Sequence, residues 1–216
     1  MKKMLLMMIA ALCACPSAYA DNWYIGFGAG GSRSVDAGNN IADGHTNLRQ
    51  YGVTNFTSSD RTDTVLSVFG GYHFNHFLGA ELDYTDLGTY DARGFAGPNF
   101  TLPTGRERDE INVLSLEAVL TAPIGDAFAV YGKIGPALAN VDESTCVSSV
   151  RFCDTSSDTT GAMHGSVGVR LTPASLIGEI RLEYSRFHDV NAGSKQFTGG
   201  DFNVWQVQYV YDFGED

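Results

Sequence analysis

The chain has 216 residues with 14 basic and 25 acidic side chains, which gives a formal net charge of −11 at neutral pH. This acidic balance argues against nucleic acid as a partner, because nucleic-acid phosphates would be repelled. After the first twenty residues no window approaches 18 apolar residues. Any crossing of a membrane must therefore be made by strands.

Residues 1–20 are predicted to be a cleaved secretory signal peptide. Two lysines precede an apolar run at 4–12, and Ala18-Tyr19-Ala20 is the small-x-small pattern that signal peptidase cleaves after. Cleavage there would leave residues 21–216 as one domain with 12 basic and 25 acidic side chains, a formal charge of −13. A lipoprotein box ending at Cys15 is a weaker alternative, because Cys13 is unusual inside such a box.

Eight segments of the exported chain alternate in side-chain character with a period of two, as strands with one apolar face do. In chain order they are residues 23–30, 64–74, 78–87, 111–121, 127–138, 162–171, 177–187 and 204–213. The last segment has ten residues, which would cover about 23 Å along a membrane normal if tilted by roughly 45°. That length matches the apolar band of an outer membrane.

Short and long connections alternate between these segments. The short turns fall at 75–77, 123–126 and 172–175, and the long polar loops at 33–63, 88–109, 140–160 and 188–201. Outer-membrane barrels show this rhythm of short periplasmic turns and long extracellular loops. We therefore predict an all-β fold: a closed eight-stranded antiparallel up-and-down transmembrane β-barrel in which segment 23–30 pairs with segment 204–213. Pro136 is the one proline inside a predicted strand, where it predicts a bulge or an interruption of pairing.

Charged side chains occupy the face opposite the aliphatic residues in mid-strand. They are Glu81, Asp83, Glu117, Lys133, Arg170, Glu179, Arg181 and Glu183. Inside a membrane barrel they would fill a narrow lumen and would have to pair, because an uncompensated buried charge is costly. A soluble lipocalin-like barrel would instead expose them to water.

Aromatic residues cluster near the strand ends, which favours the membrane interpretation. An interfacial girdle is predicted from Trp23, Tyr72, Tyr84, Trp205, Tyr211 and Phe213. Such residues sit at the two membrane–water interfaces of barrels.

Two cysteines, Cys146 and Cys153, follow the signal peptide, both within the predicted loop 140–160. In an oxidising compartment the default is a disulfide between them. A metal site would need further His or Cys ligands at suitable spacing, and none occurs nearby. Acidic loop residues such as Asp36, Asp43 and Asp60 could bind Ca²⁺ or Mg²⁺, but a solvated surface is the favoured interpretation, and no cofactor or metal is expected.

Several short motifs resemble the eight-stranded transmembrane domain of the OmpA-like family. They are Phe69-Gly70-Gly71-Tyr72, Leu78-Gly79-Ala80-Glu81-Leu82-Asp83-Tyr84, Arg181-Leu182-Glu183-Tyr184 and Tyr211-Asp212-Phe213. The resemblance implies that Glu81 and Arg181 occupy the positions of the family's central lumen ion pair, which gates a narrow pore. It also places Val119 where the family has a competing lysine and Gly168 where it has a second glutamate. We therefore expect a static structural pair rather than a gate.

Full-length members of this family also carry a periplasmic peptidoglycan-binding domain. This chain ends at Asp216, and no wall anchor is expected.

Residues 187–192 are similar to the His-x-Ser-Asn-Ala motif of lipid A deacylase barrels. The nucleophilic serine is replaced by Val190, which cannot attack an acyl group. No catalytic residue is therefore expected.

The sequence favours a structural or surface-interaction barrel of the Gram-negative outer membrane. Its expected partners are outer-membrane lipid, lipopolysaccharide, the barrel-assembly machinery and host or surface ligands of the loops. The barrel is expected to be a monomer. The alternatives are a narrow passive pore, a lipid A-modifying enzyme and a soluble lipocalin-like ligand binder.

Overall fold

The computed structural model describes residues 22–35, 55–59, 62–95, 105–125, 127–147, 152–173, 176–190 and 200–213. The predicted signal peptide lies outside these residues, as do Asp36, Asp43 and Asp60. No helix in the described segments is long and apolar enough to cross a membrane.

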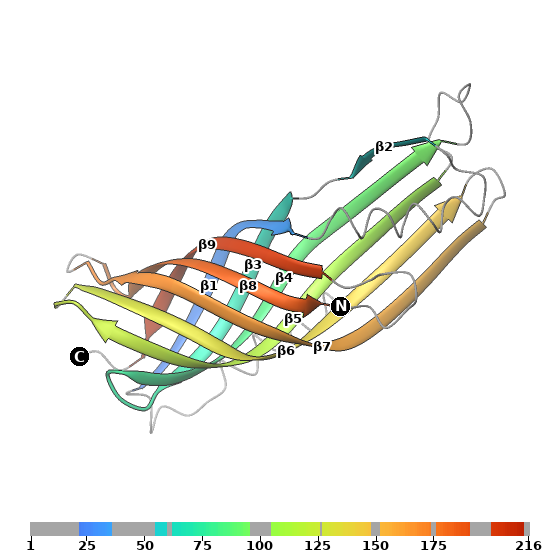
Figure 1. Cartoon of the computed structure of the whole chain (residues 1–216). Helices are drawn as coiled ribbons and strands as arrows, with labels where there is room; N and C mark the ends of the chain where they lie inside the picture. Colours follow the sequence, from blue (N-terminus) through green and yellow to red (C-terminus); the bar gives the residue numbers. More distant parts are fainter. Residues whose placement is uncertain are drawn as a thin grey trace.

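Nine strands make up the described fold (Figure 1). They are β1 (Trp23–Ser34), β2 (Asn55–Ser59), β3 (Thr62–His73), β4 (Leu78–Phe95), β5 (Gly105–Pro123), β6 (Phe128–Val147), β7 (Phe152–Leu171), β8 (Glu179–Val190) and β9 (Gly200–Asp212). Antiparallel pairing runs in the order β4-β3-β1-β9-β8-β7-β6-β5, and β4 also pairs with β5. Eight strands thus close into a barrel, and β2 is an addition to the outer part of β4. The predicted closed eight-stranded barrel, with the first strand paired to the last, is confirmed.

The strands are strongly staggered around the barrel. Following cross-strand partners once around from Trp23 leads back to β1 at Arg33, so the register advances by ten residues. A stagger of this size requires the strands to tilt by about 40° to the barrel axis. A row of paired residues therefore starts near the short-turn end on β1 and passes through β3, β4, β5, β6, β7 and β8. It reaches β9 nearer the opposite end of the barrel.

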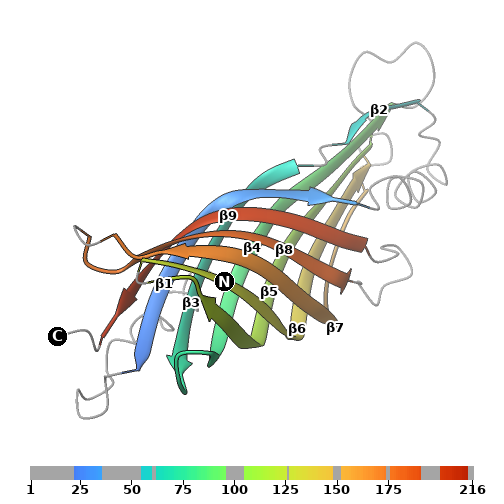
Figure 2. The ribbon, with the colours of Figure 1, turned by 60° about the vertical axis from the view of Figure 1, so that its left-hand side comes forward.

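Four strands extend far beyond the lengths predicted from the sequence. The predicted loops 88–109 and 140–160 are wrong: β4 continues to Phe95, β5 begins at Gly105, and β6 and β7 stay paired up to Val147 and Phe152. Parts of the predicted loops 33–63 and 188–201 also belong to strands: β1, β2 and β3 in the first, and β8 and β9 in the second. Figures 1 and 2 show β4 to β7 projecting past the ends of the other barrel strands. We call this projection the β4–β7 extension.

A bulge explains why the alternation in β4 breaks at the predicted strand end. The register with β5 shifts between Asp86 and Gly88, and Gly88 has a φ of 93°. A side chain there would overlap Asp63, so this left-handed position requires glycine. Beyond the bulge the two faces of β4 exchange phase, which hides the continuing strand from a period-two pattern.

Pro136 does not bulge its strand. It pairs with Met163 of β7 in continuous register. On the other side of β6, the pairing with β5 is interrupted only at residues 135 and 136. A Cβ on Gly135 would overlap the carbonyl oxygen of Leu116, so the two strands approach closely beside the proline. The strand therefore tolerates the lost N–H without changing face.

The barrel wall is apolar outside and largely polar inside. Large exposed aliphatic residues line its outer surface, among them Leu82, Leu116, Ile134, Val167 and Leu182. Toward the extension this apolar surface ends on seven strands at an outward-facing polar residue. We call these residues the polar boundary ring: Arg33, Thr64, Asp86, Asn112, Asn140, Arg186 and Asn203.

Candidate functional site

The barrel lumen holds a buried network centred on Glu81 of β4. The carboxylate accepts from Arg181 on β8, whose Nη1 lies 3.0 Å from Oε2, and from Lys133 on β6, whose Nζ lies 2.5 Å from Oε1. The hydroxyl of Tyr24 on β1 donates to the same Oε2 at 2.8 Å. Glu81 is 1% exposed and Arg181 2%, so both charges of this pair depend on protein partners.

Lys133 connects three acidic side chains from three different strands. Besides Glu81, its Nζ lies 2.7 Å from Oε2 of Glu183 on β8 and 4.0 Å from Oε2 of Glu117 on β5. Tyr131 donates its hydroxyl to Glu183 at 2.9 Å. A lysine can serve this arrangement because its ammonium group has three donors.

A competing cation is present although Val119 stands where the resemblance places the family's lysine: it is Lys133, one of the predicted lumen charges. Val119 does occupy the β5 position, but its cross-strand partner on β6 is Lys133. The side chain of Lys133 reaches Glu81 from the neighbouring strand. Glu183 lies directly opposite Gly168 in the same way, so a carboxylate is also supplied from the adjacent strand.

Further lumen groups join the network at its edges. His164 of β7 contacts Glu117 through Nδ1, and Ser115 donates to the same carboxylate at 2.5 Å. The Arg181 guanidinium lies 4.9 Å from the centre of the Tyr24 ring, close enough for a cation–π contact. At the short-turn mouth Arg170, which is partly exposed to solvent, pairs with the buried Glu179 at 3.2 Å.

An apolar layer covers the charged network on the side of the β4–β7 extension. Seven strands contribute to this lumen cap, whose members are Val65, Leu87, Ile111, Val113, Ala137, Ala139, Val141, Ala162, Phe187, Val190, Phe202 and Val204. Each member is at most 7% exposed. His164 stacks on Phe187 with ring centres 4.2 Å apart, which joins the two layers. Buried side chains from around the wall thus form two layers in the lumen: the charged network toward the short turns and the lumen cap toward the β4–β7 extension.

The lumen cap was not predicted, although the alternation pattern of the sequence contains a signal for it. Ile111 and Val113 share the phase of Ser115 and Glu117, and Phe187 shares the phase of Glu183. Apolar residues near a strand end that alternate in phase with the lumen-facing residues therefore indicate such a layer. Of the remaining cap residues, only Val141 and Val190 lie in predicted loops, and the others lie near the ends of predicted strands or just beyond them.

The predicted girdle residues lie on the outer surface in two groups. Near the short turns Trp23 packs edge-on against Tyr72, and Tyr211 against Phe213, with ring centres 5.1 and 5.2 Å apart. Nearer the polar boundary ring, Trp205 stacks with Tyr184 at 6.3 Å. Tyr84 lies on the same side and donates to Asn112 at 3.0 Å.

Cys146 and Cys153 form a disulfide with their Cα atoms 4.2 Å apart. They are directly paired residues of β6 and β7 rather than loop residues, so the bond fastens the outer end of the β4–β7 extension.

The segment resembling a deacylase motif forms a different arrangement. His188 contacts Asp201 at 2.6 Å, whereas Val190, at the serine position, is fully buried. Burial acts to raise the pKa of Asp201, but hydrogen bonds from Arg186 and His188 hold that pKa below its ordinary value. Within the described ranges no three His, Cys, Asp or Glu side chains gather in a metal-binding arrangement.

A closed eight-stranded barrel with an apolar outer face and a polar, charged interior defines the class of small outer-membrane barrels. Residues 18–216 match the family described as the OmpA-like transmembrane domain, and the chain belongs to that family.

The chain is also similar to individual proteins and solved structures. Outer membrane protein A of Salmonella typhi is 26% identical over 221 residues, covering 100% of this chain and 56% of that protein. The chain thus spans about half the length of this curated relative. The crystal structure of Neisserial surface protein A superposes with a TM-score of 0.51 at 12% identity, covering 88% of this chain and 97% of that one. The outer membrane protein OprG from Pseudomonas aeruginosa gives 0.47 at 12% identity, covering 91% and 99%.

Proposed function

We propose that this protein is a structural and surface-interaction barrel of the outer membrane with a plugged lumen and no catalysis. The observation that carries this proposal is the β4–β7 extension, a paired sheet of polar strands held above a lumen filled with side chains. Such a sheet places recognition groups outside the membrane without needing a channel or reactive residues.

The β4–β7 extension offers two kinds of contact to a surface ligand. Its outer face carries exposed ion pairs, with Arg106 bonded to Asp91 at 2.7 Å and Arg108 to Glu110 at 3.0 Å. Its far strand, β7, is paired with β8 only from Met163 onward, so the stretch 152–162 has β6 as its one described strand neighbour. An open strand edge can accept an extended segment of a partner through backbone hydrogen bonds.

The remaining partners follow from a barrel of this kind. Its apolar wall is solvated by lipid and lipopolysaccharide, and the barrel-assembly machinery inserts it after residues 1–20 are removed. A monomer suffices, because the lumen network is closed within one chain. The acidic net charge supports the absence of nucleic acid from the partners.

A narrow passive pore is the second candidate function. The charged network favours it, because Lys133 contacts three carboxylates and could exchange among them. The lumen cap opposes it, since a layer of buried apolar side chains raises the free-energy cost of passing hydrated ions.

The test of the surface role is to shorten the β4–β7 extension and leave the barrel intact. Residues 90–108 and 142–157 are each replaced by a short Asn-Gly turn, and cells carrying the variant are assayed for attachment to host-cell monolayers. The matched control carries an insertion at 74–77, the turn at the opposite end. Heat-modifiable gel migration verifies that each barrel folds. Loss of attachment in the shortened variant alone supports the proposal, and equal attachment by all folded variants contradicts it.

A further inference from the structure

The outer stretch of β7 is a sheet edge that is exposed on both of its faces. β7 pairs with β8 only from Met163, so residues 153–162 have β6 as their one neighbour among the described strands. Most residues of this stretch are exposed on either face, whereas the facing stretch of β6, residues 140–147, alternates between buried and partly buried positions. The backbone groups along an edge of this kind can pair with an added strand.

Alternate backbone groups of this edge point away from β6. In an antiparallel pair, successive residues direct their N–H and C=O groups alternately toward the partner strand and away from it. The N–H of Thr172 donates to Ala127, just before β6, at 3.0 Å, and the carbonyl of Asp158 accepts from an amide side chain of β6 at 3.4 Å. The register between β6 and β7 has no shift. Odd-numbered residues such as Thr155 and Thr159 therefore direct their N–H groups to the edge.

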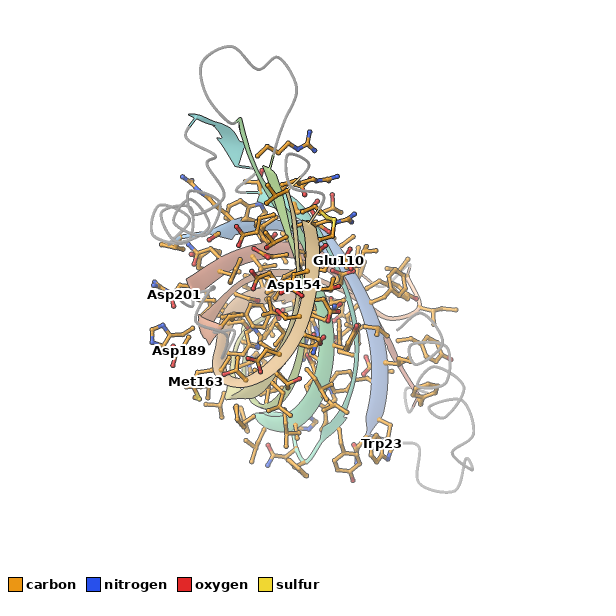
Figure 3. The ribbon with its side chains drawn as sticks, turned by 90° about the vertical axis from the view of Figure 1, so that its right-hand side faces the viewer. Trp23, Glu110, Asp154, Met163, Asp189 and Asp201 are labelled. Atoms are coloured by element: carbon orange, nitrogen blue, oxygen red, sulfur yellow. A yellow bond between two sulfur atoms is a disulfide. The ribbon has the colours of Figure 1, made fainter. Side chains whose placement is uncertain are left out.

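Carboxylates of the preceding residues occupy two of these edge N–H groups. The N–H of Thr155 donates to Asp154 Oδ1 at 3.0 Å, and the N–H of Thr159 donates to Asp158 Oδ1 at 2.9 Å. Figure 3 shows Asp154 far from Trp23, which lies at the short-turn end. A strand that pairs here must displace both carboxylates, which would otherwise face its carbonyl oxygens. A cationic side chain on that strand offsets the displacement with a charge-assisted hydrogen bond.

The negative charge of this edge lies on one face. Asp154 and Asp158 share that face, about 13 Å apart along the strand, and Glu143 of β6 lies on it between them. Arg106 and Arg108 of β5 lie on the opposite face, in rows with Cys146 and Ser144. Two copies of the edge would bring the same carboxylates together, and like charges opposite one another destabilise a strand pair. The edge therefore favours a basic strand over a second copy of itself.

We propose that the β7 edge binds an extended basic segment of a partner protein, which adds as a strand with cationic side chains opposite Asp154 and Asp158. On binding, the two carboxylates leave the edge N–H groups, and carbonyl oxygens of the partner take their place. The inference rests on the surface-interaction role proposed above and names the class of partner. Neutral and acidic segments are disfavoured, because they displace the carboxylates without compensating them.

The test titrates the full barrel in lipid nanodiscs with three threonine-rich peptides, followed by amide NMR. The first peptide has two lysines four residues apart, on one face of a strand. The second has the same composition with the lysines adjacent, on opposite faces. The third has glutamates in place of the lysines. We expect the first to bind roughly fivefold more tightly than the second, the effect of one cross-strand ion pair, and the third not to bind. Bound first peptide should protect the amide protons of Thr155 and Thr159 from exchange.

Two variants separate the charge of the edge from its backbone pairing. Asp154→Asn/Asp158→Asn keeps the accepting side-chain oxygens but should abolish the preference for the lysine peptides. The matched control, Glu110→Gln/Asp142→Asn, removes the same charge from the opposite face and should bind like wild type. Thr155→Pro/Thr159→Pro keeps both carboxylates but removes edge N–H groups, which an edge strand tolerates, and should lose the first peptide. Heat-modifiable migration and unchanged amide shifts in β6 verify that each variant folds.

Three results would overturn the proposal. They are wild-type barrel binding none of the peptides, equal binding of the lysine and glutamate peptides, and undiminished binding of the first peptide by the folded proline variant. If that variant does not fold, unprotected amides of Thr155 and Thr159 in the wild-type complex would overturn it instead. Host-cell attachment by the shortened extension is measured separately, so failure of this proposal is distinguishable from failure of the surface-interaction role.

Discussion

Lys133 is the side chain on which the lumen network depends. It contacts carboxylates from β4, β5 and β8, so one ammonium group compensates negative charge from three strands. Arg181 shares only Glu81 with it, and also bonds Glu179. We therefore expect the stability of the network to depend strongly on Lys133 as well as on the Glu81–Arg181 pair that the family resemblance singles out.

Replacing Lys133 with methionine should destabilise the barrel by about 3 to 5 kcal/mol, because buried carboxylates lose their compensating charge. Arg170→Gln is the matched control. Its side chain is 23% exposed at the lumen mouth, and its partner Glu179 keeps a second ion pair with Arg181 at 3.4 Å, so we expect a smaller loss than for Lys133. Urea unfolding in lipid vesicles measures both variants. If the two lose equal stability, Lys133 has no special role.

The lumen residues themselves were predictable, but their partners were not. Period-two alternation assigns Glu81, Lys133 and Glu183 to one face, because neighbouring side chains point to opposite faces. Which of them meet depends on the ten-residue stagger between strands, and a single sequence does not contain that quantity. This is why Val119 suggested a missing lysine that the adjacent strand supplies.

The β4–β7 extension shows where strand prediction stops at the scale of the element. In the membrane the outer face of a strand must be apolar, so alternation is strong. Outside it the outer face meets water, and residues 140–147 and 152–160 keep the backbone pairing of strands without an apolar outer face. The bulge at Gly88 adds a change of phase. A polar, Ser/Thr-rich stretch therefore resembles a loop in sequence while it forms a sheet.

The β4–β7 extension should lose stability as pH rises from about 4 to about 7. Burial, with Glu143 and Asp91 nearby, raises the pKa of Asp109 from 3.8 to about 7 in the folded sheet. As pH rises, Asp109 of the unfolded chain ionises first. The stability of the extension is therefore full below about pH 4 and falls progressively until the pH reaches the folded-state pKa of about 7. Amide protection factors in β5 at pH 5 and pH 8 measure this, and Asp109→Asn should abolish the difference. A variant with the wild-type pH dependence would exclude Asp109 as the cause.

The disulfide should stabilise the outer end of β6 and β7 without affecting the barrel. Cys146→Ser/Cys153→Ser removes the closure of a short loop, a loss of roughly 2 to 3 kcal/mol for the local unit. Proteolysis near residues 148–151 should accelerate, while heat-modifiable migration stays unchanged. A shift in barrel migration would show that the bond supports the whole fold.

In the whole molecule, the strand number and stagger that close the barrel also set the width of its lumen. Eight strands with this stagger leave an interior that side chains can fill, as the charged network and the lumen cap do. Closure also pairs β1 with β9, which leaves the transmembrane wall without a free edge. The closed transmembrane wall is thus distinct from the β4–β7 extension, where residues 152–162 of β7 pair with β6 alone among the described strands.

The conductance of single barrels in planar lipid bilayers tests the sealed lumen most directly. Wild-type barrel at neutral pH should give no current steps, because the lumen cap lies across the lumen above the charged network. Phe187→Ser/Phe202→Ser, which opens the cap, should give small steps if its barrel still shows heat-modifiable migration. Regular current steps from the wild-type barrel would contradict the plugged lumen and establish the narrow pore instead.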